Sequence, residues 1–171
     1  MDTERRGGGE KAGEEEGEAG LLEMMAVMSL PGFDVNCSIC PSSGYPPLLH
    51  AVWGLIKGNL EEKCLVRVLS VGGLDVNATF EVSGTHLTGL RLAAVNGHEG
   101  CTRLLLGAPG VDVNKPDSTH GETPLRATVI NGHEGCTRLL IGAPGVDVNK
   151  PESTDGRTPL CAAAEIGRAH V

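Results

Sequence analysis

A twenty-residue segment of this chain occurs twice. Residues 97–116, GHEGCTRLLLGAPGVDVNKP, recur 35 residues later at 132–151, and the copies differ only where Leu106 is replaced by Ile141. A period of this length, with two apolar clusters in each unit, is typical of a solenoid in which each unit packs on its sequence neighbours. The search for function therefore moves from a catalytic pocket to a repeated surface.

The composition excludes several classes of protein. With one Trp, one Tyr and two Phe in 171 residues, the core must be built from Ala, Leu and Val, and the net charge of −8 argues against a nucleic-acid-binding face. The most apolar early stretch, 21–30, is too short to span a bilayer, and no secretion signal precedes it. Six dispersed cysteines do not suggest a disulfide framework. We expect an intracellular, cytoplasmic protein without membrane insertion.

The first twenty residues differ from the rest. Residues 1–20, MDTERRGGGEKAGEEEGEAG, contain no Ile, Leu, Val or aromatic residue and are rich in Glu and Gly. Nothing in them can offset the entropy lost on ordering. We therefore predict a disordered acidic tail.

Two landmarks recur along the remainder of the chain. An Asp-Val-Asn triplet closes the segments 33–36, 74–77, 111–114 and 146–149. The second landmark precedes each predicted first helix and reads PPLLHAV at 46–52, TGLRLAA at 88–94, TPLRATV at 123–129 and TPLCAAA at 158–164. Thr caps a helix and Pro suits its first position, so Thr-Pro predicts a helix start. Glycine then ends that helix, and a second helix follows with an apolar stripe of Leu104, Leu105, Leu139 and Leu140.

The order G-x-TPL, AA, GH, LLL and DVN resembles the ankyrin repeat over residues 21–167. The resemblance implies an all-α fold, a solenoid of stacked helix–turn–helix units joined by hairpin-like loops. The landmarks place a partial unit at 21–43, whole units at about 44–79, 80–114 and 115–149, and a partial unit at 150–167.

The chain departs from the ankyrin pattern at several positions. The first unit has Pro46-Pro47 for Thr-Pro, and the second has Gly89 for Pro and His86 at the turn glycine. We expect the hairpins of these two units to be less regular. The histidine that follows Thr-Pro-Leu in the family is replaced throughout, by Arg91, Arg126 and Cys161. We therefore expect a weaker polar network between units than in regular ankyrin arrays.

The C-terminal unit supplies a single helix, so we expect this chain to be a fragment of a longer ankyrin-repeat protein. An uncapped unit leaves an apolar face open, which predicts self-association through that end. The final residues 166–171, IGRAHV, resemble the translation of a sequencing adapter and are treated as a candidate non-native tail. Gly167 also fits the glycine of the repeat, so a native ending stays open.

Candidate chemistry is sparse. Cys37 and Cys40 have the spacing of a zinc knuckle or redox pair, but a metal site needs two further ligands nearby, and we interpret them as incidental turn cysteines. Cys101 and Cys136 follow His98 and His133 by three residues, in step with the repeat, which indicates scaffold roles. We expect the histidines to bond the backbone and the cysteines to pack as small apolar groups. No catalytic, cofactor or metal site is predicted.

A surface remains as the functional candidate. In the ankyrin family the hairpin tips and first helices form a concave face that commonly contacts partners. Carried over by position, the partner-binding residues are Ser118, Thr119, His120, Glu122, Ser153, Thr154, Asp155 and Arg157 at the tips, with Val95, Asn96, Ile130 and Asn131 at the first-helix ends. We expect a non-enzymatic scaffold that binds a protein partner. The alternative is a targeting or regulatory module of a larger enzyme or ligase whose catalytic domain lies outside this chain.

Overall fold

The computed structural model describes residues 26, 36, 46–58 and 60–169. The predicted acidic tail, nearly all of the partial unit 21–43, the Cys37–Cys40 pair and residues 170–171 lie outside the described residues. The chain divides into two compact parts, which span Met1–Leu74 and Asp75–Val171.

In the N-terminal part, Met1–Leu74, the described helices form a packed pair. Helix α2 spans Pro47–Ile56 and helix α3 spans Glu62–Leu69. Proline at the first helical position lacks only an N–H that would have no partner within the helix, which is why Pro46-Pro47 replaces Thr-Pro without loss of the helix. The helices bury apolar side chains at helical spacing, namely Leu48, Leu49, Ala51, Val52 and Leu55 from α2 and Cys64, Leu65 and Val68 from α3.

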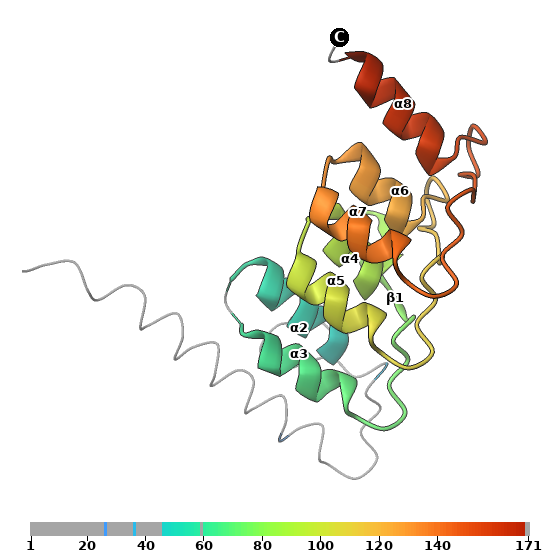
Figure 1. Cartoon of the computed structure of the whole chain (residues 1–171). Coiled ribbons are helices and arrows are strands. Elements are labelled where there is room, and N and C mark those ends of the chain that lie inside the picture. The colour runs from blue at the N-terminus through green and yellow to red at the C-terminus, as the bar shows by residue number, and fades with distance from the viewer. Residues whose placement is uncertain (1–25, 27–35, 37–45, 59, 170–171) are drawn as a thin grey trace, which may run out of the picture. The chain divides into compact units, whose positions relative to one another are not determined.

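The C-terminal part, Asp75–Val171, contains two helix pairs, the helix α8 and a two-stranded hairpin. Its elements are β1 (Thr79–Val82), β2 (Thr85–Thr88), α4 (Gly89–Val95), α5 (Glu99–Leu106), α6 (Pro124–Ile130), α7 (Glu134–Ile141) and α8 (Pro159–Ala169). Helices α4, α6 and α8 pack in one row, and α5 packs on α7 in a second row (Figure 1). The pairs α4–α5 and α6–α7 join the rows. The predicted helical solenoid is confirmed, with one small two-stranded sheet added.

Local signals set the ends of the first helices. The hydroxyl oxygens of Thr88 and Thr123 accept the N–H groups of Arg91 and Arg126 at 3.1 and 3.3 Å, as expected for capping residues. Gly97 then leaves α4 with a left-handed φ of +67°. A Cβ at Gly97 would also lie 2.6 Å from the Nδ1 atom of His133 in the next unit. Glycine is needed there for both conformation and space.

The second helices bury a narrower face than the run of leucines suggests. Leu105 and Leu140 are fully buried, whereas Leu104 and Leu139 are half-buried. The prediction that all four form the buried stripe is therefore wrong for Leu104 and Leu139. Residues four apart share a helix face, and the buried face pairs each inner leucine with the cysteine four residues earlier.

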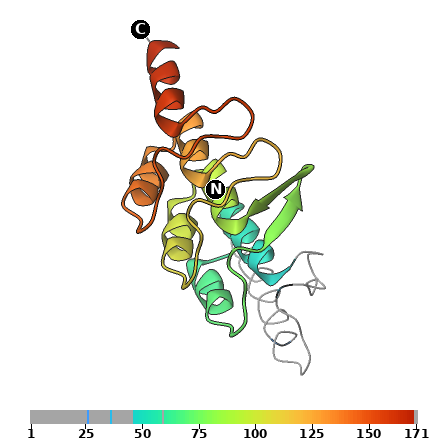
Figure 2. The same ribbon diagram turned by 90° about the vertical axis from the view of Figure 1, so that its right-hand side faces the viewer.

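Strands β1 and β2 form a regular antiparallel hairpin that projects from the helices (Figure 2). Phe80 pairs with Leu87 on the buried side. The turn residues Ser83 and Gly84 have positive φ angles of 52° and 82°, the conformation that matches the twist of two-residue hairpins. The expectation of a less regular hairpin is wrong for the second repeat, because the buried Phe80–Leu87 pair and the Ser83-Gly84 turn define the hairpin without the proline and the usual turn glycine.

The recurring asparagine of the Asp-Val-Asn triplet links successive units. Asn77 donates from Nδ2 to the carbonyl of Gly110 at 2.8 Å and accepts the N–H of Asp112 at 2.7 Å. Asn114 makes the same two bonds to Gly145 and Asp147. Each asparagine thus satisfies two backbone groups of the next loop, which explains why the triplet recurs with the period of the fold.

Candidate protein-binding surface

Two loops project beside the β1–β2 hairpin, one before α6 and one before α8 (Figure 2). Backbone bonds close both loops in the same way. The N–H of Asp117 donates to the carbonyl of Glu122, and the N–H of Glu152 donates to the carbonyl of Arg157, each at 3.0 Å. The tips between these bonds therefore have a defined conformation that recurs from unit to unit.

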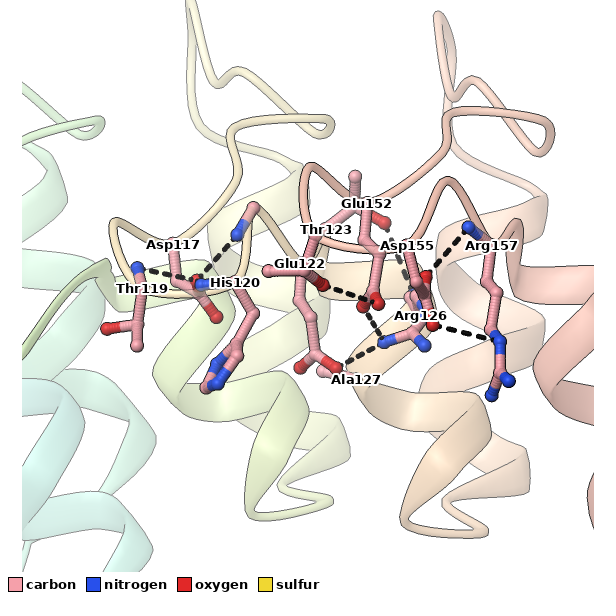
Figure 3. A network of polar contacts seen from close by, with 12 residues as sticks. Asp117, Thr119, His120, Glu122, Thr123, Arg126, Ala127, Glu152, Asp155 and Arg157 are labelled. Atoms are coloured by element: carbon pink, nitrogen blue, oxygen red, sulfur yellow. Dashed lines mark hydrogen bonds and ion pairs between the residues drawn. The ribbon is translucent and has the colours of Figure 1, made fainter.

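Asp117 organises the first tip from inside. Its Oδ1 atom accepts the N–H groups of Thr119, His120 and Gly121 at 3.1, 2.8 and 3.1 Å (Figure 3). Burial acts to raise the pKa of Asp117. The His120 N–H, the charge of Arg91 and the Thr119 N–H outweigh it and hold the pKa below its usual value. The turn is thus built around a carboxylate anion.

Neighbouring tips are joined by backbone bonds. Ser118 donates its N–H to the carbonyl of His86 at 3.0 Å, and its hydroxyl oxygen accepts the His86 N–H at 2.8 Å. One unit later, Ser153 donates to the carbonyl of His120 at 3.1 Å. Gly121 permits this approach, because a Cβ there would lie 2.1 Å from the hydroxyl oxygen of Ser153. The hairpin and two tips form one continuous edge.

Beneath this edge lies a buried network of charges. Arg91 in α4 donates to Asp117 at 2.9 Å and to the Glu122 side chain at 2.6 Å, both in the following loop. Its Nε atom also donates to the Glu122 carbonyl at 3.3 Å. The Arg91 and Asp117 side chains are 7% and 3% exposed. Arginine suits this role because its planar fork can bond several acceptors at once.

A second buried arginine lies one repeat later, although its Nε atom, unlike that of Arg91, has no hydrogen-bond partner among the described residues. Arg126 in α6 forms ion pairs with Glu122 of its own unit and with Glu152 of the next loop (Figure 3). The arginines that replace the histidine therefore provide buried polar links between the repeats; the expectation of a network weaker than in regular ankyrin arrays stays a prediction. Arginine reaches further than histidine, and acidic residues in the following loops provide its partners.

In the last repeat, the buried ion pairs are replaced by exposed ones. Cys161 occupies the position of Arg91 and Arg126 and is exposed. Arg157 instead bonds Asp155 and Glu165 on the surface, each at 2.9 Å. A side-chain hydrogen bond with Glu152, and then the Arg157 N–H, lower the pKa of Asp155. The buried network thus ends at Glu152.

The structure places the predicted tip residues on this edge and the four first-helix residues at the C-terminal ends of α4 and α6, away from the tips. The tip residues other than Glu122 are exposed, and so are three of the four first-helix residues, with Val95 half-buried. Asn96 and Asn131 fold back on their own helices and donate to the carbonyls of Leu92 and Ala127 at 2.8 Å. Ile130 is 42% exposed, which is high for a large apolar side chain.

Glu122 is placed differently from the other tip residues. Its side chain is 19% exposed and its carboxylate is shared between Arg91 and Arg126. The edge offers the exposed His120 as a contact, whereas Glu122 supports the loop from below. Sequence reasoning missed the supporting residues Asp117 and Glu152, although the acidic residue after each Asn-Lys-Pro was a usable signal.

The His–Cys pairs have the predicted scaffold roles. His98 accepts the N–H of Cys101 at Nδ1 at 3.1 Å, and the Nε2 atom of His133 lies 3.1 Å from the carbonyl oxygen of Val95 in the preceding unit. Cys101 and Cys136 are fully buried. Among residues 46–58 and 60–166, no cluster of three His, Cys, Asp or Glu side chains could hold a metal ion. Within the same described part, no helix is long and apolar enough to cross a membrane.

Comparison with known proteins identifies the fold family. A family model described as ankyrin repeats (3 copies) matches residues 48–152 and again residues 90–171. No curated protein matches the chain. The two matches together cover most of the sequence and include the helix pairs α4–α5 and α6–α7, the hairpin and the asparagine links described above. The chain belongs to the ankyrin repeat family.

Proposed function

We propose that this chain is a non-enzymatic module that binds a protein partner through its loop-tip edge together with the ends of its first helices. Ankyrin repeats are generally protein–protein interaction modules. The observation that carries the proposal is the contrast between the residues beneath the loop-tip edge and the side chains on it. The charges beneath it are paired and buried, whereas the tip side chains above them are exposed on a backbone that is bonded from unit to unit.

Such an edge suits recognition because little of it must become ordered on binding. Asp117 holds its tip by three backbone bonds, and Ser118 and Ser153 join successive tips. A preorganised surface loses less conformational entropy when a partner binds. His120 provides an exposed polar contact on this edge, and Ile130 provides an exposed apolar contact at the C-terminal end of α6.

The test compares two triple variants of the full chain. The edge variant is His120→Ala, Ile130→Ser and Ser153→Ala, and the matched control is Arg103→Ala, Glu134→Ala and Arg138→Ala on the exposed side of α5 and α7. A partner recovered with the wild-type chain is titrated against both. We expect at least about a tenfold loss of affinity for the edge variant, because contact residues at an interface centre carry most binding energy. Both variants should have the same melting temperature as the wild type, because surface substitutions change stability little.

Retained affinity in the edge variant would contradict the proposal. Loss of affinity in the control alone would move the interface to the second-helix face. Either result is interpretable because all six side chains are exposed. Ser153 bonds His120 through its backbone N–H, so Ser153→Ala keeps that link.

A further inference from the structure

The two tips of the loop-tip edge, residues 118–121 and 153–156, are built on the same backbone frame. Each follows an Asn-Lys-Pro segment and one acidic residue, Asp117 or Glu152. The N–H of that acidic residue closes each loop by donating to the carbonyl five residues later, at 3.0 Å in both loops. The glycines Gly121 and Gly156 have left-handed φ angles of 72° and 71°. The tips therefore differ mainly in the side chains that hold them.

The first tip is held from within its own loop. The Oδ1 atom of Asp117 accepts the N–H groups of residues 119–121 at 3.1, 2.8 and 3.1 Å. Aspartate side chains are short enough to reach the backbone of the residues that follow them, and they favour such turns. Because one buried carboxylate fixes three N–H groups, this tip has little freedom to change its conformation.

The second tip lacks these bonds. Glu152 is longer than Asp117 by a methylene group, and its carboxylate oxygens bond the Thr154 hydroxyl at 2.8 Å and the Arg126 guanidinium. Within the described part of the chain, no side chain accepts the N–H groups of residues 154–156. The backbone of this tip is therefore fixed at its ends and not at its centre.

The preceding repeat also holds the two loops unequally. Arg91 donates three hydrogen bonds to the first loop, to the Asp117 carboxylate, the Glu122 carboxylate and the Glu122 carbonyl. Among the residues that the structure describes, Arg126 forms one ion pair with the second loop, to Glu152, and its buried Nε atom has no hydrogen-bond partner. The second loop is thus held by fewer contacts than the first.

We propose that the loop-tip edge combines a preformed tip at 118–121 with an adaptable tip at 153–156, and that the acidic residue before each tip, Asp117 or Glu152, sets this difference. The part played in recognition rests on the proposed function, whereas the difference in rigidity does not. The preformed tip fixes the position of the partner at little entropic cost. The adaptable tip adjusts its backbone to the partner and becomes ordered on binding.

Amide hydrogen exchange, followed by NMR on the full chain without a partner, measures the rigidity of each tip. We expect the protection factors of residues 119–121 to exceed those of residues 154–156 by at least about tenfold, because hydrogen bonds to a charged acceptor are strong. Glu152→Asp should raise the protection factors of residues 154–156 by about tenfold, since the shorter side chain then accepts their N–H groups as Asp117 does. Asp117→Glu should lower those of residues 119–121.

Glu134→Asp is the matched control, because it makes the same change of length at a side chain that is 77% exposed on α7. It should leave the protection of both tips as it is in the wild type. Thermal melts check that every variant folds. Asp117→Glu removes buried bonds, so Glu152→Asp decides the test if Asp117→Glu does not fold.

Equal protection of the two tips in the wild type would overturn the proposal, and so would unchanged protection of residues 154–156 in Glu152→Asp. The partner recovered with the wild-type chain tests the part played in recognition. On binding, residues 154–156 should gain protection by a larger factor than residues 119–121, and an equal or smaller gain would refute the adaptable contact. Exchange in the free chain requires no partner, so its result is separate from the affinity test of the binding surface.

Discussion

Replacing Arg126 with methionine tests whether the buried charges hold the units together. The Arg126 side chain is 8% exposed and lies between Glu122 and Glu152, which are 19% and 6% exposed. Methionine keeps much of the apolar stem but removes the cation. Two carboxylates from adjacent units then remain beneath the loop-tip edge without the positive charge that separates them. The change therefore leaves uncompensated charge at a boundary between units.

The expected cost follows from this geometry. Removing one partner of a buried ion pair typically destabilises a protein by about 3–5 kcal/mol. Glu122 keeps its bond to Arg91 at 2.6 Å, so the lower end of that range, about 3 kcal/mol, is expected. For a domain of about 100 residues, each 1 kcal/mol lowers Tm by roughly 4–8 °C. Arg126→Met should therefore lower Tm by about 12–24 °C.

Urea and thermal unfolding followed by circular dichroism at the helical band provide the measurement. The matched control is Arg157→Met, since Arg157 is 49% exposed and its pairs with Asp155 and Glu165 are on the surface. Exposed pairs contribute at most about 1 kcal/mol. The double variant Arg126→Met with Glu152→Gln should recover part of the loss, because it removes one of the buried anions that Arg126→Met leaves unpaired.

The reasoning is refuted if Arg126→Met costs no more than Arg157→Met. It is also refuted if Glu152→Gln makes the Arg126→Met variant less stable by the full cost of an independent substitution, since residues of one network should not act additively.

Three further predictions concern the packing, the asparagine links and pH. Leu105→Ala should cost about 2–5 kcal/mol in urea unfolding, and Leu104→Ala clearly less, because only Leu105 is fully buried. Asn114→Ala should cost about 1–2 kcal/mol through loss of its bonds to Gly145 and Asp147, whereas Asn149→Ala should change the urea midpoint little. The lowered pKa of Asp117 means that its contribution is complete above the ordinary value of about 3.9 and is lost as pH falls through the lower folded value. Asp117→Asn should therefore lower the urea midpoint at neutral pH and reduce its fall below about pH 4, and a pH dependence equal to that of the wild type would contradict this.

Much of the fold could be predicted because the repeat itself reports it. A twenty-residue segment that recurs with one change must form the same structure twice, and the Thr-Pro and glycine positions mark where its helices begin and end. The scaffold roles of His98 and Cys101 followed from the same periodicity. Periodicity alone did not separate Leu104 from Leu105, because a run of adjacent leucines spans a wide arc of the helix and only the position of the packed neighbour decides which of them is buried.

The binding edge was located by position, but its supports were not found. Arg91 was interpreted as a lost histidine, yet its partners lie 26 and 31 residues further along the chain. Glu122 was predicted to be a binding residue at the tip, but its ion pairs with Arg91 and Arg126 make it a support of the loop. Local sequence patterns contain no information on which of many acidic residues will face a given arginine, because that choice depends on the stacking of one unit on the next.

The amino-acid sequence by itself determined the repeat length, the helix starts, the recurrence of the Asp-Val-Asn triplet and hence the ankyrin family, since these depend on local preferences and on identity between copies. Contacts between repeats determined which residues are buried and which charges pair. Leu90 and Leu160 show the difference most directly. They occupy the same position in the same motif, and one is 1% exposed and the other 70%, because burial is a property of the neighbour and not of the residue.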